Sequence, residues 1–236
     1  MSKKVIVVGD IHGCFDTFKE LEKQFPDDAT ISLVGDLVDR GPKSMDVVQH
    51  VINKRYDCVR GNHEQMMIDY FRLSEKRQYR GLWDINGGKE TLASYDGHNP
   101  RIMEMHVKWM EKLPIWNEYW DCYNKKGEHL LVSHSACWPF WNWSDDRRKA
   151  NADLVRSHAL WGRPKQMRPI KGIYNVFGHT PVDEEKIKQI YANIDTGVVY
   201  GSYMTALEFP SMKLYKQELI DKTGKWDLRK PFGSIY

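Results

Sequence analysis

The sequence predicts an α/β protein in which two mixed β-sheets pack as a sandwich flanked by helices. Three observations predict this fold class: strand and helix patterns alternate over the first 63 residues, a helical stretch follows, and the second half is rich in strands. Such alternation is typical of sheets with crossover helices that are parallel at least in part. The 236 residues are 41% hydrophobic, which is enough for a sizeable core, and we expect a single domain over residues 1–236.

The first 63 residues contain three expected strands and two expected helices. The first helix covers residues 14–24, and the second covers residues 42–53 with Pro42 in its first turn. The strands are short β-branched or aliphatic runs at residues 3–8, 30–34 and 57–59.

A helical insertion or cap is expected around residues 64–111, with a break at Gly87-Gly88. Two strands joined by a turn at residues 124–127 then form a hairpin signature over residues 115–123 and 129–133. The remaining expected strands are residues 174–177, 188–192, 203–209 and 213–217.

Composition excludes several classes of protein. The 35 Lys and Arg residues nearly balance 32 Asp and Glu residues, so bulk charge does not favour nucleic-acid binding, which needs a concentrated basic surface. No segment reads as a signal peptide or a membrane span, and we expect a cytoplasmic protein that does not bind membranes. Four scattered cysteines are expected to be free thiols: Cys14, Cys58, Cys122 and Cys137.

Three segments near the N-terminus share one design, in which an apolar strand ends in a glycine followed by polar residues. In open α/β sheets, ligands bind at the carboxyl ends of the strands, so these three tips are expected to form one site. The segments are Val7-Val8-Gly9-Asp10-Ile11-His12-Gly13, Leu33-Val34-Gly35-Asp36-Leu37-Val38-Asp39-Arg40-Gly41 and Val59-Arg60-Gly61-Asn62-His63-Glu64.

Singly, each Gly-Asp pair is an ordinary turn or helix cap, but together the tips concentrate carboxylates. Burying such a cluster is unfavourable unless metal cations neutralise it. The cluster holds no thiol, which argues against a structural zinc centre, and its oxygen and imidazole groups suit Mn, Fe, Zn or Co in a hydrolytic site.

With these motifs the sequence resembles the metallophosphoesterases of calcineurin-like fold, and within them the phosphoprotein phosphatase group. The gaps between the motifs are 26 and 27 residues. The resemblance extends to Val132-Ser133-His134, to Phe177-Gly178-His179-Thr180 and to Asn193-Ile194-Asp195-Thr196-Gly197. The chain resembles short bacterial and phage enzymes of the family more than eukaryotic ones. The Asp195-Thr196-Gly197 sequence resembles the diadenosine tetraphosphatase branch.

The resemblance implies two divalent metal ions, Mn in the first place, with Fe, Zn, Co or Ni as alternatives. Asp10 and His12 would bind one ion, and Asp36 would bridge to the second, which Asn62, His134 and His179 would also bind. Two ions about 3.5–4 Å apart would hold a bridging hydroxide that attacks phosphorus directly.

The remaining polar residues of the motifs are expected to act on the substrate. His63 follows a metal ligand and is left to protonate the leaving group, with Asp39 orienting its ring. Arg40, Arg60 and Asn62 are expected to bind the substrate phosphate. The resemblance to phage and bacterial members implies the same role for Arg163. Surface roles are the alternative for Arg60 and Arg163.

Other distinctive residues have simpler interpretations. The aromatic run over residues 138–143 is expected to pack in the core, with a wall or lid of the active-site cleft as the alternative. Five histidines are expected to be solvated or packed rather than catalytic: His50, His98, His106, His129 and His158.

The sequence therefore predicts a serine/threonine phosphoprotein phosphatase, with possible action on phosphotyrosine, whose partner is a phosphoprotein or phosphopeptide. The alternative is a dinucleoside polyphosphate hydrolase with a nucleotide substrate, which the short chain weakens because it leaves little room for a nucleotide-binding region. A silent binding module that recognises phosphorylated partners would lack a ligand or the acid, and none is missing. Turnover of diadenosine tetraphosphate against a phosphopeptide would separate the two enzymes.

Overall fold

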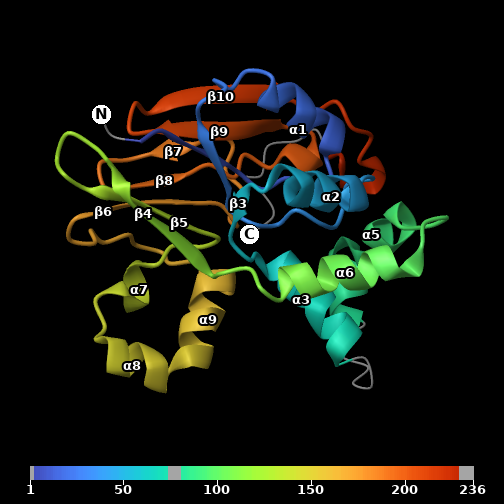
Figure 1. Cartoon of the computed structure of the whole chain (residues 1–236), viewed down its shortest axis with the longest axis horizontal. Coiled ribbons are helices and arrows are strands. Elements are labelled where there is room, and N and C mark those ends of the chain that lie inside the picture. The colour runs from blue at the N-terminus through green and yellow to red at the C-terminus, as the bar shows by residue number, and fades with distance from the viewer. Residues whose placement is uncertain (1–2, 74–80, 229–236) are drawn as a thin grey trace.

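Two five-stranded β-sheets form the centre of the computed structural model, which describes residues 3–73 and 81–228. Figure 1 shows the sheets layered against each other with helices outside them. The α/β sandwich expected from the sequence is confirmed. Residues 74–80 of the expected helical insertion lie outside the described residues, as do residues 1–2 and 229–236 of the expected domain.

The first sheet has the strand order β10-β9-β1-β2-β3. Its first three strands in the chain are parallel, and β9 and β10 extend it in antiparallel fashion beyond β1. The strands are β1 (Val5–Val8), β2 (Thr30–Leu33), β3 (Asp57–Cys58), β9 (Tyr203–Phe209) and β10 (Lys213–Glu218).

The second sheet has the order β4-β5-β6-β8-β7, with β5, β6 and β8 parallel and the two edge strands antiparallel. The strands are β4 (Trp116–Tyr123), β5 (His129–Ser133), β6 (Ile173–Phe177), β7 (Lys186–Ile187) and β8 (Tyr191–Asn193). The single strand expected at residues 188–192 was therefore wrong: a turn divides this region into two short paired strands, so alternation alone did not reveal the reversal.

Helices α1 (Phe15–Glu22) and α2 (Ser44–Lys54) cover the outer face of the first sheet (Figure 1). Pro42 precedes α2 instead of lying in its first turn, because the helix begins only after the N-cap residue Lys43. A second helical group lies beside them in the figure: α3 (Asn62–Arg72), the π-helical turn η1 (Asp84–Gly88), α5 (Lys89–Ser94) and α6 (Pro100–Met110). Gly87, with φ 107°, breaks this helical run as expected.

A third helical group follows β5 and packs on the second sheet. It consists of α7 (Trp138–Trp141), α8 (Asp145–Ala150) and α9 (Ala152–Trp161). The aromatic run lies here, and Phe140 is fully buried in a cluster with Leu131 and Ile173 while Trp138, Trp141 and Trp143 pack against it. Core packing, the first interpretation of this run, is confirmed. Two 3-10 turns, η2 (Val198–Tyr200) and η3 (Gly224–Trp226), complete the described elements.

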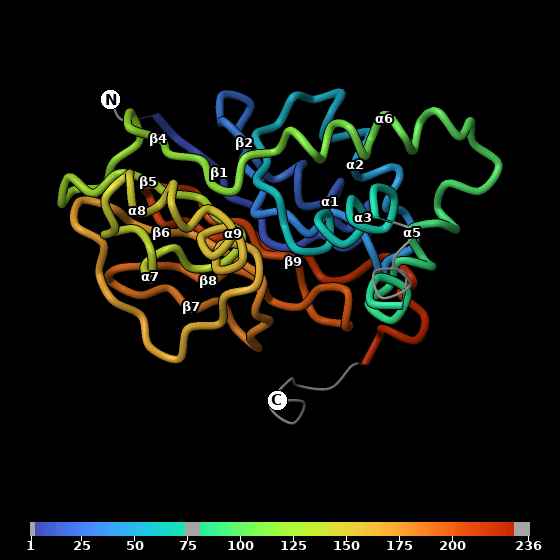
Figure 2. Tube along the Cα trace, turned by 90° about the horizontal axis from the view of Figure 1, so that it is seen from below, coloured from blue at the N-terminus to red at the C-terminus, as the bar shows by residue number. Residues whose placement is uncertain are grey.

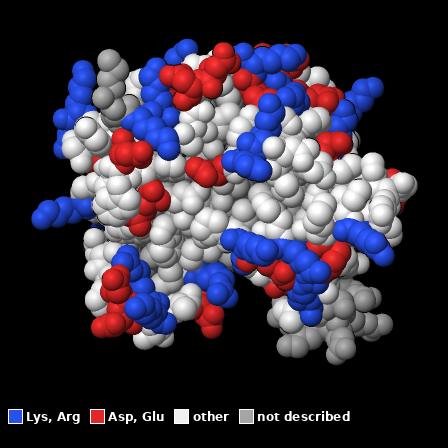
Figure 3. Space-filling view, viewed as in Figure 1, with Lys and Arg blue, Asp and Glu red and all other residues white. Residues whose placement is uncertain are grey.

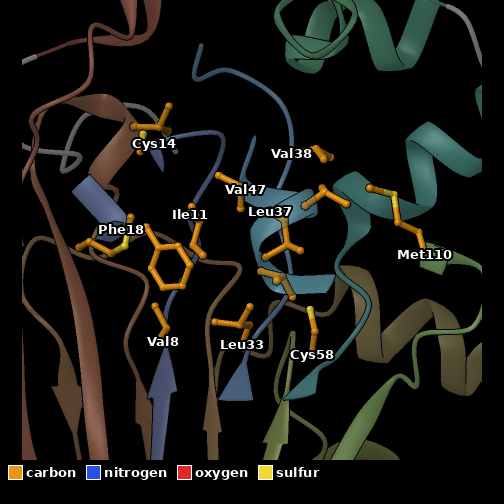
Figure 4. Packing of buried hydrophobic residues seen from close by; sticks show 14 of the residues in the cluster. Val8, Ile11, Cys14, Phe18, Leu33, Leu37, Val38, Val47, Cys58 and Met110 are labelled. Carbon is orange, nitrogen blue, oxygen red and sulfur yellow. The ribbon is translucent and has the colours of Figure 1, made fainter. Parts of the chain in front are cut away.

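Alternate residues of β1 build two different cores. Val5 and Val7 face the second sheet, where they join a cluster with residues such as Val132 and Val176. Ile6 and Val8, the other two residues of the strand, face the helices instead, and Figure 4 shows Val8 close to Phe18 of α1. This period-2 pattern is what a strand between two apolar layers requires.

Two further expectations can be compared with the structure. All four cysteines are free, as expected, and the structure shows that they are also buried. Among the described residues there is no helix of the length and apolar character that crossing a membrane requires.

Candidate metal centre and phosphate site

The polar residues of the candidate site follow parallel strands of both sheets at their carboxyl ends. Short loops after β1, β2 and β3 carry the three N-terminal motifs, and those after β5, β6 and β8 carry His134, His179 and Asp195. The strands of the two sheets thus direct residues that are far apart in the sequence to one place.

Backbone hydrogen bonds join these loops to one another. The amides of Ile11 and His12 donate to the carbonyl of Asp36, and the amide of Gly178 donates to the carbonyl of His134. The Asp36 carboxylate accepts the amide of His63 at 3.0 Å. Because each loop is held by its neighbour, the side chains of the site are positioned by the backbone.

The backbone around the site adopts positive φ angles, which residues other than glycine seldom adopt. Seven described residues other than glycine have positive φ, and five of them are candidate site residues: His12, Asp36, Asp39, Arg40 and His179. Such conformations persist only where the surrounding structure holds them, and they concentrate at functional sites.

Two glycines are required by close approach to the cluster. A Cβ atom on Gly178 would lie 2.0 Å from Oδ1 of Asp10, and one on Gly61 would lie 2.2 Å from Oδ1 of Asp36. Neither carboxylate could keep its position next to a larger residue.

The potential ligand atoms form two groups that share one residue. His12, Asp36 and His63 offer ligand atoms within 4.8 Å of one another, and so do Asp36, His134 and His179. The shared position of Asp36 is the one that a bridging carboxylate needs. Asn62 lies with the second group, because its Oδ1 is 2.8 Å from Nε2 of His134 and 2.9 Å from Nδ1 of His179.

Backbone carbonyls fix the orientation of two of the histidine rings. Nδ1 of His12 donates to the carbonyl of Val38 at 2.9 Å, and Nδ1 of His134 donates to that of Val34 at 2.8 Å. Because a carbonyl can only accept, both rings are protonated on Nδ1, and the lone pair of Nε2 faces the cluster. This is the arrangement in which histidine binds a metal ion.

Burial governs the ionisation of the cluster. It raises the pKa of Asp36 to about 7, against the opposing effects of the His63 amide, Arg40 and Arg163. Burial likewise lowers the pKa of His134 to about 4. The imidazoles are therefore neutral, and the negative charge of the carboxylates is unfavourable without a counter-ion. Such a set of donors fits a pair of divalent cations.

Asp10 lies at the edge of the two groups of ligand atoms. Its two carboxylate oxygens accept the amide of His179 at 3.2–3.3 Å, and it belongs to neither group of ligand atoms. It still belongs to the cluster, because burial and then the charges of Asp195 and Asp36 raise its pKa well above the usual range. Its role as a ligand stays a prediction.

His63 and Asp39 form the pair expected of a proton donor and its orienting carboxylate. Nδ1 of His63 donates to Oδ2 of Asp39 at 2.6 Å, which leaves Nε2 facing the cluster 3.9 Å from Oδ2 of Asp36. The Asp39 carboxylate also accepts Nε1 of Trp83 at 2.9 Å and the hydroxyl of Thr91 at 2.7 Å. The helical group thus holds the orienting carboxylate in place.

The expected phosphate-binding arginines divide into two sets. Nη1 of Arg40 lies 2.8 Å from Nε2 of His12, and Nε of Arg163 lies 3.4 Å from Nε2 of His179, so both border the cluster. Arg60 instead donates to the carbonyl of Glu111 at 2.5 Å and to Oε1 of Gln65 at 3.0 Å. Its guanidinium is directed to the end of α6, and its phosphate role stays a prediction.

Several residues that support the site were given no role from the sequence, although Glu64 and Asp195 stand within its motifs. Glu64 is fully buried and accepts the amides of Asp36, Leu37 and Gly61 at 2.7–2.8 Å. Its position three residues after the N-cap residue Gly61 is the glutamate half of a capping box, a signal that could have revealed it. Asp195 follows a strand as the other site residues do, whereas Trp83 and Thr91 carry no local signal.

The face beside the site is hollowed. Figure 3 shows a recess between the α7–α9 group and the group that contains α3 and α6, with Lys and Arg side chains on both of its sides. The first residues of α3 include Asn62 and His63, so the candidate site lies at the inner end of that helix. Asp and Glu side chains also lie on both sides, and the Lys and Arg side chains of this mixed border suit an anionic substrate.

The family model of the calcineurin-like phosphoesterases matches residues 3–189. The sequence is 28% identical over 235 residues to the asymmetrical bis(5'-nucleosyl)-tetraphosphatase PrpE of Bacillus cereus strain Q1, covering 89% of this chain and 92% of that protein.

Two solved structures share the fold. One is a protein proposed to be a diadenosine tetraphosphatase, with a TM-score of 0.66, 22% identity and coverage of 92% of this chain and 94% of that one. The other is a protein serine/threonine phosphatase of Saccharomyces cerevisiae, with a TM-score of 0.58, 16% identity and coverage of 94% and 81%.

Proposed function

The chain belongs to the calcineurin-like phosphoesterase family, and from this premise we propose that it hydrolyses dinucleoside tetraphosphates into unequal products, a nucleoside triphosphate and a nucleoside monophosphate. The observation that carries this proposal is the similarity to PrpE over 92% of the length of that protein. Since the relative is of comparable length, the shortness of this chain does not argue against a nucleotide substrate. The dinucleoside polyphosphate hydrolase, the alternative hypothesis from the sequence, is therefore preferred to the phosphoprotein phosphatase.

The metal-ligand residues in this proposal are Asp10, His12, Asp36, Asn62, His134 and His179. Two divalent cations, when bound, supply an activated water and withdraw negative charge from the phosphoryl oxygens. Their identity is expected to be Mn, with Fe, Zn, Co or Ni as alternatives.

The protein's own residues then bind and protonate the substrate. Arg40 and Arg163 border the cluster at His12 and His179 and orient the phosphoryl oxygens through paired hydrogen bonds. Asn62 can donate its amide hydrogens to the same oxygens. His63, oriented by Asp39, delivers a proton to the leaving oxygen.

A second candidate function is hydrolysis of phosphoserine and phosphothreonine in proteins. The observation that favours it is the His63–Asp39 pair, whose oxygen–nitrogen distance is 2.6 Å. A serine or threonine alkoxide is a poor leaving group that needs a proton, whereas the phosphate oxygen released from a dinucleotide is already a stable anion. A well-oriented acid is therefore of more use in cleaving a phosphomonoester.

A substrate panel with excess Mn tests both candidates. Diadenosine tetraphosphate, p-nitrophenyl phosphate and serine, threonine and tyrosine phosphopeptides are compared by kcat/KM, with Asp36→Asn as the inactive control. We expect the highest value for the dinucleotide, with ATP and AMP as products. A phosphopeptide value at least tenfold above it would establish the second candidate, and two molecules of ADP would contradict unequal cleavage.

A further inference from the structure

A pocket next to the metal centre has no role in the mechanism above. Its volume is about 270 Å³, and we name it the Arg163 pocket. The segment that follows α9 forms one wall, and the ends of β6, β7 and β8 form the rest. Figure 2 shows this segment curving round beside β7 and β8.

We propose that the Arg163 pocket binds the nucleotide portion of the substrate that extends beyond the phosphate held at the metal centre. The ligand class is a nucleoside polyphosphate, with its outer phosphates next to Arg163 and its nucleoside deeper in the pocket. This inference deepens the proposed function and rests on it.

The position of the pocket places it on the path of an extended substrate. Arg163 lines the pocket, and its Nε is 3.4 Å from Nε2 of the candidate ligand His179. Thr180, the next residue in the chain, also lines the pocket, and its carbonyl accepts the side-chain amide of Asn193 at 2.9 Å. A chain of phosphates that leaves the metal centre past Arg163 therefore enters this pocket.

The charge of the lining residues fits a polyanion. Three of them are cations, namely Arg163, Lys165 and Lys186, and none of the described lining residues is acidic. The whole chain has a net charge of only +3, and the three cations around this one small cavity carry a charge of the same size. Such a concentration attracts phosphate groups more strongly than the overall composition suggests.

The inner surface of the pocket carries aromatic rings. Tyr191 of β8 stacks on Phe177 of β6 with ring centroids 5.7 Å apart and an interplanar angle of 24°. Phe177 is buried, whereas Tyr191 is half-buried, so the tyrosine ring is the one available to a base or a ribose. A volume near the lower limit of ligand pockets, about 300 Å³, fits one nucleotide rather than a whole dinucleotide.

The test compares pocket variants of the full chain on a long and a short substrate. The variants are the double substitution Lys165→Ala with Lys186→Ala, and Tyr191→Leu with Tyr191→Phe as its ring-retaining counterpart. Lys188→Ala is the matched control, because Lys188 lies in the turn between β7 and β8 but does not line the pocket. KM is measured for diadenosine tetraphosphate and for p-nitrophenyl phosphate in excess Mn.

We expect the double lysine variant to raise KM for the dinucleotide at least tenfold more than KM for the aryl phosphate. Tyr191→Leu should raise the dinucleotide KM several-fold more than Tyr191→Phe does. Equal changes for both substrates, or the same effect from Lys188→Ala, would overturn the inference.

Inhibition by ATP separates failure of this inference from failure of the proposed function. If the wild-type protein does not cleave the dinucleotide, the proposed function is refuted. Inhibition of aryl phosphate hydrolysis by ATP then tests whether the Arg163 pocket binds a nucleotide. Inhibition that is at least tenfold weaker in the double lysine variant supports the pocket. The inference is overturned if ATP does not inhibit the wild type, or if it inhibits the double lysine variant equally well. It is also overturned if the variants raise KM only for a phosphopeptide with acidic flanking residues.

Discussion

The indole ring of Trp226 lies over the guanidinium of Arg40, with the ring centroid 5.6 Å from Cζ. Tyr200 lies 5.3 Å from the same carbon, so two aromatic rings border this arginine. Nε1 of Trp226 donates to Oε1 of Glu90 in α5 at 3.1 Å. The chain near its C-terminus thus connects the helical group to a candidate phosphate ligand.

Replacing Trp226 by Ala is expected to weaken phosphate binding. A cation–π contact contributes about 0.5–2 kcal/mol, and its loss should raise the inhibition constant of inorganic phosphate roughly 2–30-fold. Trp226→Phe, which keeps a ring but loses the hydrogen bond to Glu90, is the control. If the two variants bind phosphate equally weakly, the ring is not what positions Arg40.

Replacing His63 by Asn is expected to affect substrates according to their leaving group. Loss of a general acid lowers kcat by about 10²–10⁴-fold where an alkoxide departs. Nitrophenolate and nucleotide leaving groups are stable anions, so p-nitrophenyl phosphate and the dinucleotide should lose far less. Steady-state kinetics on phenyl, alkyl and nitrophenyl phosphates measure this difference, and a uniform loss across the series would refute the role of His63 as acid.

Asp36→Asn is expected to remove both metal ions, because Asp36 is the one residue common to the two groups of ligand atoms. His134→Ala, which belongs to the second group only, should retain about one ion. Elemental analysis of the purified variants measures the stoichiometry. His50→Ala is the matched control, because His50 pairs with Glu22 away from the cluster. Two ions in Asp36→Asn would contradict the bridging assignment.

His106 is expected to make the protein less stable in mild acid. Its ring is buried, with Nδ1 2.7 Å from the hydroxyl of Tyr95, and burial lowers its pKa to about 4. The unfolded chain, with an ordinary histidine pKa of about 6.5, then binds more protons than the folded chain between pH 4 and 6.5. The contribution of the neutral ring to stability is therefore present above pH 6.5 and is lost as the pH falls to about 4.

Denaturant unfolding at several pH values measures this contribution, on the order of 3 kcal/mol. His106→Gln should flatten the loss of stability between pH 6.5 and 4 relative to the wild type, while His98→Gln, in which an exposed histidine is changed, should not. An unchanged slope in His106→Gln would show that this ring is not the group that titrates.

Local sequence patterns predicted the parts of the fold that depend on local physics. The β-branched run at Val5–Val8 and the glycine-terminated strand tips have a strong short-range preference, and the structure has strands and tight loops there. The strand expected at residues 188–192 was wrong because a reversal of direction depends on which strand it pairs with. Pairing is a long-range property that a single segment does not encode.

The site residues that directly follow a strand could be predicted from the sequence, because each stands next to a recognisable strand pattern. The partners of Asp39 could not be predicted, because Trp83 and Thr91 reach it from 44 and 52 residues away along the chain. The contacts of Arg60 were not predictable either: its place in a motif suggests a phosphate role, which stays a prediction, and its guanidinium donates to carbonyls at the end of α6. Contacts between distant segments decide which side chains of a motif face the site.

The tethered rings of His12 and His134 bear on how the centre acquires its metals. Each ring is held through Nδ1 by a backbone carbonyl, and the loops that carry both are bonded to neighbouring loops. A cation that arrives therefore meets donors already in place and need not order them. We therefore expect one divalent ion to replace another without reorientation of these two rings.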